Sequence, residues 1–300
     1  MDWQATKEFL SPCFPEEVCT EMELLYPGEL REIRIRADKP VVFCTANRMT
    51  ALKWRPDSHE VALLAEALCD HGLYTHSEET REGYVTLRGG HRMGLSGHVC
   101  MHGLKPELRK IGSLCIRIAS SWPGCADGLM GFAFHHDRVN SMLIIGAPGS
   151  GKTTMLRDLA RQLGSGAKPC QVAMIDERGE LAASVDGVPQ LDVGEWTDVL
   201  DGCPREYAVP WLVRSMSAQV IVTDELGGSG DAAAVREAIA CGVAVMASVH
   251  ASSLHELAGR SSIASLMASR CFDWFVLLHP DGGGQIQCVY DRTGSPVKSL

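Results

Sequence analysis

Residues 146–153 (GAPGSGKT) match the phosphate-binding pattern G-x-x-x-x-G-K-[ST] at every fixed position. An apolar stretch at 142–145 leads into the pattern, and apolar residues with helical spacing follow it. In such a loop, glycines let backbone N–H groups surround a phosphate, and the start of the next helix adds positive potential. A glycine-rich turn without a ligand is the alternative, which this strand–loop–helix context disfavours. The spacing therefore predicts a nucleotide-phosphate site.

Two side chains at the end of this loop carry the expected chemistry. Lys152 is expected to reach the β- and γ-phosphates of a nucleotide, and Thr153 to offer its hydroxyl to Mg²⁺. The predicted cofactors are therefore ATP and Mg²⁺. The residues predicted to surround the nucleotide are Gly146, Ala147, Pro148, Gly149, Ser150, Gly151, Lys152, Thr153 and Thr154.

A second apolar stretch, 220–223, ends in two adjacent carboxylates, Asp224 and Glu225. After a phosphate loop, this pattern is typical of an aspartate that orients the Mg²⁺ shell and a glutamate that polarises the attacking water. An Asp-Glu pair after a strand is common by itself, and without the phosphate loop it would favour a solvated turn. We therefore expect Asp224 as a metal ligand and Glu225 as the catalytic carboxylate.

A third apolar stretch, 172–175, is followed by the acidic sequence DERGE at 176–180. Parallel strands of one sheet present their carboxyl ends to the same crevice, so these side chains would face the same site. Glu177 and Glu180 are thus further candidate catalytic residues. The alternative is an ordinary acidic turn with Arg178 as its local partner.

His250 ends the apolar stretch 243–249. A lone histidine after a buried strand is more often a structural hydrogen-bonding residue. At the same crevice, however, it could contact the γ-phosphate or the water-activating carboxylate, and we include it among the candidate catalytic residues.

The elements that must position these residues are short apolar stretches alternating with helical patterns. Buried parallel strands have continuous apolar sequences, and their alternation with helices predicts an α/β sheet over residues 139–300. The expected strands are 142–145, 172–175, 220–223, 243–249 and 274–278.

The first half has a different pattern and predicts a smaller α+β domain over residues 1–124. Strands are expected at 32–36, 41–43, 83–88, 94–101 and 114–119. Ser58 is the expected cap of a helix that continues through Leu68. Residues 125–138, with two histidines and several glycines, are the expected linker between the domains.

Composition excludes several classes of protein. The 300 residues are 45% hydrophobic and 22% charged, which argues against intrinsic disorder, and the net charge of −9 lacks the basic field of a non-specific nucleic-acid binder. The twelve cysteines include no C-x-x-C pair, so free thiols in a reducing compartment are expected. The polar N-terminus and the lack of an apolar stretch near eighteen residues predict a soluble, cytoplasmic protein.

The order of phosphate loop, acidic box (176–180), Asp-Glu strand end (224–225) and strand-end histidine resembles that of the secretion and pilus-retraction ATPases. More closely, residues from about 29 to 290 resemble the stage III sporulation AA family of that superfamily. The segments that carry this resemblance are 32–36, 83–99, 201–204 and 214–217. Two departures from the family pattern are Ser217 in place of proline and Cys115 in place of an asparagine. Neither touches the nucleotide residues.

The resemblance implies a RecA-like P-loop ATPase core and an activity in endospore formation of Gram-positive bacteria. The protein would act in the mother cell, recruited peripherally to membrane proteins of a channel complex that reaches the forespore. It also implies a homo-oligomeric ring, most often a hexamer, in which N-terminal arginines reach the nucleotide. The matching arginines here are Arg88, Arg92 and Arg117, and no arginine is a fixed element of the phosphate-loop motif itself.

Two other functions stay open at this point. One is a nucleotide-gated switch that binds ATP with little turnover, against which the presence of Glu225 argues. The other is a RecA-like nucleic-acid motor, against which the acidic balance argues, so no nucleic-acid partner is expected.

Overall fold

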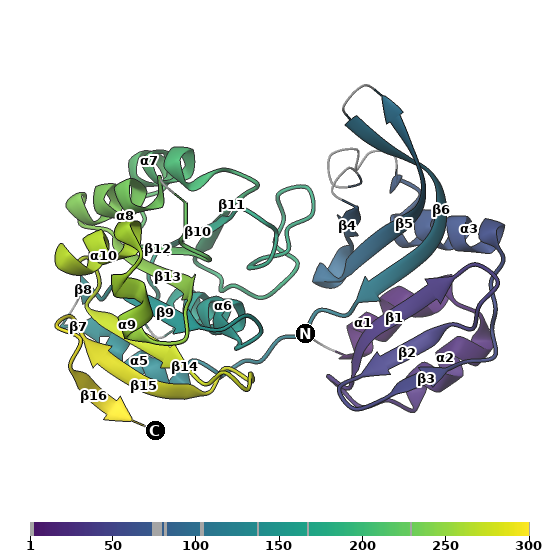
Figure 1. The fold of residues 1–300 in the computed structure, drawn as a ribbon, viewed down its shortest axis with the longest axis horizontal. Coiled ribbons are helices and arrows are strands. Elements are labelled where there is room, and N and C mark those ends of the chain that lie inside the picture. Colours follow the sequence, from purple (N-terminus) through teal and green to yellow (C-terminus); the bar gives the residue numbers. More distant parts are fainter. Residues whose placement is uncertain are drawn as a thin grey trace. The chain divides into compact units, whose positions relative to one another are not determined.

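The computed structural model describes residues 3–73, 80, 83–102, 105–136, 138–166, 168–228 and 230–299. The chain divides into two compact units, Met1–Ser121 and Trp122–Leu300 (Figure 1). Each unit has a hydrophobic core of its own.

The N-terminal unit is built on a sheet whose strands, within the described residues, follow the order β3-β2-β1-β6-β5-β4, with antiparallel neighbours. Alternate residues of its central strand, including Ile33 and Ile35, are buried against the helices, while Glu32, Arg34 and Arg36 point to the other face. The strands are β1 (Leu30–Arg36), β2 (Val42–Thr45), β3 (Met49–Ala51), β4 (Tyr84–Thr86), β5 (Arg92–His102) and β6 (Lys105–Arg117). The helices are α1 (Trp3–Leu10), α2 (Glu16–Glu23) and α3 (Ser58–Leu68), with 3₁₀ turns at Ser11–Cys13 and Arg88–Gly90.

Helix α3 begins one residue earlier than the sequence suggested, because its cap is Asp57 and not Ser58. The Asp57 carboxylate accepts hydrogen bonds from the backbone N–H groups of His59 and Glu60, at 2.7 and 2.8 Å. The Glu60 side chain accepts in return from the Asp57 N–H at 2.7 Å. This reciprocal capping box satisfies N–H groups that a helix start otherwise leaves unpaired.

The C-terminal unit is built on a sheet of order β11-β10-β12-β13-β9-β14-β15-β16 among the described residues. The pairs from β11 to β14 are parallel, and β15 and β16 extend the sheet in antiparallel pairing. Strands are present at all five stretches expected from the sequence: β9 (Met142–Gly146), β10 (Val172–Asp176), β12 (Val220–Thr223), β13 (Ala244–His250) and β14 (Trp274–Leu278). The strands β11 (Thr197–Asp201), β15 (Ile286–Asp291) and β16 (Pro296–Ser299) were not expected.

Helices cover both faces of this sheet, which explains why its central strands are apolar on both sides. Along β9, Met142 and Ile144 face the core that α6 completes, while Leu143 and Ile145 face the core completed by α7, α8, α9 and α10. The helices are α6 (Lys152–Ser165), α7 (Arg205–Ser215), α8 (Asp231–Ala240), α9 (Leu254–Ala258) and α10 (Ser261–Ala268).

The segment expected to be a linker, 125–138, lies in the C-terminal unit and is not an independent connection. It contains helix α5 (Asp127–Ala133) and strands β7 (Phe134–His135) and β8 (Arg138–Val139). Leu129 and Ala133 are fully buried in the same core as α6. The glycines that suggested a linker sit on a short helix, where tertiary burial outweighs their low helix propensity.

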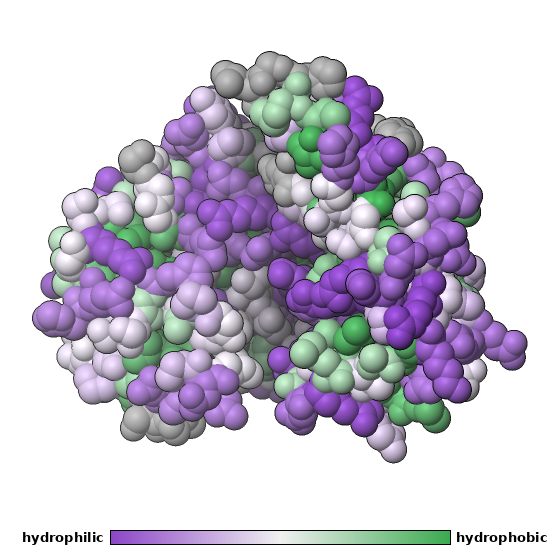
Figure 2. All heavy atoms as spheres, turned by 45° about the vertical axis from the view of Figure 1, so that its right-hand side comes forward, coloured by the Kyte–Doolittle hydropathy of each residue, from purple (hydrophilic) through white to green (hydrophobic). Residues whose placement is uncertain are grey.

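Surface residues of the molecule are mostly polar. Figure 2 shows hydrophilic residues over most of the face it presents, with hydrophobic residues in small groups. Among the described residues, no helix has the length and apolar character needed to span a bilayer.

We predict that Leu129→Ala lowers the free energy of unfolding by about 2–5 kcal/mol, because it removes a fully buried side chain and leaves a cavity. Urea unfolding of the whole chain measures the change. Gly131→Ala on the same helix is the matched control, since a Cβ there meets nothing within 4 Å and should not destabilise. A Leu129→Ala protein as stable as wild type would show that this segment is a linker after all.

Candidate active site

The phosphate loop connects β9 to α6, and its backbone requires glycine. Gly149 and Gly151 both have left-handed φ angles, +77° and +97°. A Cβ on Gly151 would also lie 2.7 Å from the backbone nitrogen of Gly284, whose N–H donates to the Ser150 carbonyl at 3.0 Å. The loop after β14 therefore packs against the phosphate loop. Sequence reasoning missed this contact, although three consecutive glycines at 282–284 mark it.

Lys152 lies at the first position of α6, and its side chain is directed into the site. Its Nζ donates to the Ala147 carbonyl at 2.8 Å and lies 3.1 Å from Nδ1 of His250. Burial lowers the pKa of Lys152, and the charge of Glu225 partly offsets this. Thr153 and Thr154 follow in the same helical turn and are half-buried.

Glu225 follows β12 and contacts one residue at the end of β13 and another just after the end of β10. Its N–H donates to Ser248 Oγ at 3.0 Å, which fixes the residue in a left-handed backbone conformation (φ 39°). Its Oε1 lies 2.5 Å from Nε2 of His250, and its Oε2 pairs with the guanidinium of Arg178. Partial burial raises the pKa of Glu225, but the hydrogen bond from His250 and the nearby positive charges outweigh this and hold the pKa below its usual range. Lys152, His250 and Glu225 therefore form one connected chain, in which His250 contacts both the lysine and the carboxylate.

Asp224 is a buried polar residue whose hydrogen bonding is incomplete among the described residues. The residue is 1% exposed, and its Oδ2 finds no hydrogen-bond partner among the described residues. Burial, followed by the charges of Asp176 and Glu180, raises the pKa of Asp224 to about 7. A buried carboxylate oxygen without a partner is costly, and a bound cation would remove that cost.

Mg²⁺ fits these residues when nucleotide phosphates complete its coordination. The described residues contain no group of three or more His, Cys, Asp or Glu placed to hold a metal by themselves. Mg²⁺ commonly uses one or two protein oxygens together with waters and substrate phosphates. Asp224, with the Thr153 hydroxyl, would supply the protein part.

Asp176 organises the acidic box. Its two carboxylate oxygens accept from the N–H groups of four consecutive residues, 180–183, at 2.7–3.2 Å. From the other side, the buried guanidinium of Arg157 donates to the carbonyls of Glu180 and Leu181, at 2.8 and 2.6 Å. The loop is thus held rigidly, with the Glu180 side chain exposed.

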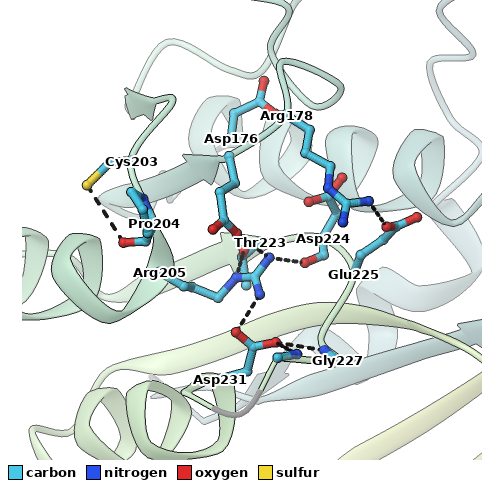
Figure 3. Close-up of polar contacts among 12 residues, drawn as sticks. Asp176, Arg178, Cys203, Pro204, Arg205, Thr223, Asp224, Glu225, Gly227 and Asp231 are labelled. Carbon is cyan, nitrogen blue, oxygen red and sulfur yellow. Dashed lines mark hydrogen bonds and ion pairs between the residues drawn. The ribbon is translucent and has the colours of Figure 1, made fainter. Parts of the chain in front are cut away.

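Arg205 joins the acidic box to the Asp-Glu strand end, and sequence reasoning gave it no role (Figure 3). It is 6% exposed and donates to Thr223 Oγ1 at 2.8 Å and to the Asp224 carbonyl at 2.7 Å. It also pairs with Glu177 at 3.1 Å and with Asp231 at 2.8 Å. The sequence signal that could have indicated it is an arginine directly after the Asp201–Pro204 segment, at the start of a helix.

Arg178 is not a local partner within its own turn, which corrects one alternative interpretation of the acidic box. It reaches Glu225, 47 residues away in the chain, and is 64% exposed. Figure 3 shows its guanidinium directed at the Glu225 carboxylate. The core therefore does carry an arginine at the expected catalytic carboxylate, although none belongs to the phosphate-loop motif.

The three N-terminal arginines lie in the other unit, each with a neighbour there. Arg88 pairs with Asp70 at 3.0 Å, Arg117 lies 3.6 Å from Glu32, and the Arg92 guanidinium sits 3.4 Å above the Tyr84 ring. Arg88 and Arg117 are 70% and 67% exposed, so their neighbours do not bury them.

Comparison with known sequences shows similarity over nearly the whole chain. The family model described as "Sporulation stage III, protein AA" matches residues 17–297. Stage III sporulation protein AA of Bacillus subtilis (strain 168) is 38% identical over 272 residues, which cover 89% of this chain and 88% of that protein.

Comparison with solved structures identifies the fold. The ATPase DotB of Legionella pneumophila matches with a TM-score of 0.59 and 15% identity, over 88% of this chain and 77% of that one. The pilus retraction motor PilT with bound ADP matches with a TM-score of 0.57 and 14% identity, over 87% of this chain and 76% of that one. At these identities the likeness shows the fold alone. It confirms the expected α/β class, a RecA-like P-loop ATPase core with a smaller N-terminal α+β domain.

We predict that the stability of the Mg²⁺-free protein depends on pH through Asp224. Its pKa is about 7 in the folded chain, whereas an unfolded aspartate has a pKa of about 4, so the folded state holds the proton more tightly. The folded state therefore loses stability as pH rises from about 4 to about 7, and it stays less stable above pH 7. Asp224→Asn should raise the melting temperature at pH 8 and raise it less at pH 5.

Thermal denaturation in Mg²⁺-free buffer measures this difference. Glu195→Gln removes an exposed carboxylate from the same unit and is the matched control, expected to give no such pH dependence. An Asp224→Asn shift that is equal at both pH values would contradict the burial of a carboxylate with a raised pKa.

Proposed function

The chain belongs to the sporulation stage III protein AA family, as its motifs indicated, and on this basis we propose that it binds ATP with Mg²⁺ at residues 146–154 and hydrolyses it. One observation carries the proposal: the phosphate-loop lysine, His250 and Glu225 form a connected chain beside a buried, unpartnered oxygen of Asp224. These side chains follow β9, β12 and β13 of one sheet, and this arrangement supports a phosphate site, a cation site and a carboxylate suited to activating water.

Each side chain has a role that its position supports. Lys152 would neutralise the β- and γ-phosphates, exchanging its present carbonyl and histidine contacts for phosphate oxygens. Thr153 and Asp224 would hold Mg²⁺, which supplies charge neutralisation at the transferred phosphoryl group. Glu225 would orient the attacking water and take its proton as the water attacks the γ-phosphorus, while the bond from that phosphorus to the β–γ bridging oxygen breaks and ADP leaves. His250, which contacts both Lys152 and Glu225, would hold these two side chains in position relative to each other.

The acidic-box carboxylates take different parts in this proposal. Glu177 is committed to Arg205, so we assign it the positioning of that arginine against the Asp224 carbonyl. Glu180 is exposed on the rigid loop and is the second candidate for water activation. A nucleotide-gated switch with little turnover is the second candidate function, because both carboxylate oxygens of Glu225 already have partners.

We predict that Lys152→Ala abolishes ATP binding, whereas Glu225→Gln binds ATP and hydrolyses it about 10²–10⁴-fold more slowly, since the amide cannot accept a proton from water. Calorimetric binding and phosphate release measure the two effects, with Glu195→Gln as an exposed control. If Glu225→Gln turns over normally and Glu180→Gln does not, water activation belongs to the acidic box. If the wild-type protein binds ATP without turnover, the second candidate function, a nucleotide-gated switch, is supported.

A nucleic-acid motor has no support beyond the shared core fold. The net charge of −9 disfavours a polyanionic partner. Added DNA should therefore leave ATP turnover unchanged.

We further propose that the protein works as a homo-oligomeric ring, most simply a hexamer, on the cytoplasmic side of a sporulation channel complex. The support is the family assignment and the fold shared with DotB and PilT. In a ring, the exposed Arg88 and Arg117, with Arg92, could serve the nucleotide of a neighbouring subunit. Membrane proteins of that complex would recruit the ring peripherally.

We predict that two inactive variants restore each other when mixed, if these arginines act between subunits. One parent is Lys152→Ala, and the other carries Arg88→Ala, Arg92→Ala and Arg117→Ala together. In mixed rings, some interfaces combine an intact phosphate loop with intact arginines and should hydrolyse ATP. Turnover is measured alongside mass in solution. Mixed rings that form but stay inactive would leave the three arginines as structural residues.

A further inference from the structure

Three arginines surround the candidate site within the C-terminal unit, and one of them differs from the others. Arg157 and Arg205 are 8% and 6% exposed. Arg157 donates to backbone carbonyls, and Arg205 donates to a hydroxyl and a carbonyl and pairs with two carboxylates, so both hold loops together. Arg178 is 64% exposed, and its partner is the Glu225 carboxylate. Its environment is therefore that of a cation available to a ligand, whereas the other two are parts of the frame.

The backbone around Arg178 holds the side chain at the site without burying it. The residue lies one turn beyond the carboxyl end of β10, between the anchored Asp176 and the N–H groups of 180–183 that Asp176 binds. Gly179, with φ at +64°, turns the chain immediately after it. The loop is thus fixed at both ends, while the long side chain of Arg178 keeps its freedom to choose a partner.

The ion pair between Arg178 and Glu225 is weak enough for Arg178 to exchange it for another anionic partner. Arg178 uses NH1 towards one carboxylate oxygen, so most of the five guanidinium donors stay available. Exposed ion pairs contribute about 0–1 kcal/mol, so a doubly charged terminal phosphate group nearby competes well against one carboxylate. A phosphate bound by Lys152 would lie near this pair, because Lys152 connects to Glu225 through His250.

We propose that Arg178 is a ligand of the terminal phosphate of the bound nucleotide, supplied by the same chain, and that it leaves Glu225 for that phosphate when a triphosphate binds. This inference rests on the proposed ATP site. It adds a cation in cis, independent of any arginine from a neighbouring subunit. The exchange also releases one oxygen of Glu225 at the moment when a water must be held there. A diphosphate lacks the group that draws Arg178 away, so the side chain distinguishes ATP from ADP.

The test compares a non-hydrolysable ATP analogue with ADP, each with Mg²⁺, by calorimetry on the full chain. Arg178→Ala should weaken the analogue about 10- to 100-fold and leave ADP within about threefold, so the preference for triphosphate collapses. Arg178→Lys should recover part of the preference, because it keeps the charge without the planar fork. Arg260→Ala is the matched control: Arg260 also pairs with a glutamate, Glu256, at 2.7 Å and is 42% exposed.

Several results would overturn the inference. Equal losses for both nucleotides would show that Arg178 holds the loop and does not read the terminal phosphate. Unchanged affinities for both would remove it from the site. Faster turnover of Arg178→Ala would make the pair with Glu225 an inhibitory latch. If the wild-type protein and Arg260→Ala bind neither nucleotide, the proposed ATP site itself fails, and that result is visible before Arg178 is considered.

Discussion

The candidate site depends on burying charged side chains at the carboxyl edge of a parallel sheet. Lys152, Asp176, Arg205 and Asp224 are each less than a tenth exposed. An unpaired charge in such a place costs several kcal/mol or more, so the loops that follow the strands are shaped by the need to satisfy these groups. The four N–H groups that converge on Asp176 are the clearest result, because they convert a loop into a rigid support.

Two neighbouring buried groups meet this constraint differently: one has all its hydrogen bonds within the protein, and the other does not. Arg205 has four oxygen partners and is fully committed, so it locks the acidic box, the Asp-Glu strand end and the start of α8 to one another. Asp224, beside it, keeps one oxygen without a partner among the described residues. Arg205 is thus part of the frame, whereas Asp224 has an oxygen that a ligand could pair with. The raised pKa of Asp224 has the same cause, since burial and neighbouring carboxylates both disfavour its charge.

The same reasoning applies to the positive charges. A guanidinium enclosed by carbonyls, such as that of Arg157, cannot move without leaving buried acceptors unpaired. The Arg178 guanidinium is exposed and bonded to the carboxylate of Glu225, the residue proposed to activate water. Among these arginines, Arg157 is buried and holds a loop, whereas Arg178 is exposed at a rigidly anchored position. This distinction cannot be made from residue type, because all of these side chains are arginines.

The sequence by itself determined the five central strands and the strand–loop–helix setting of residues 146–153, and it predicted roles for Lys152, Asp224 and Glu225. These follow from local signals: continuous apolar stretches, glycine spacing, and the rule that parallel strands end at one edge. Only the tertiary structure decided which partner each charged side chain takes. Arg178 meets a residue 47 positions away, and α5 is helical because Leu129 is buried by a core that the rest of the unit builds. Such choices depend on contacts between distant segments, which local propensity does not encode.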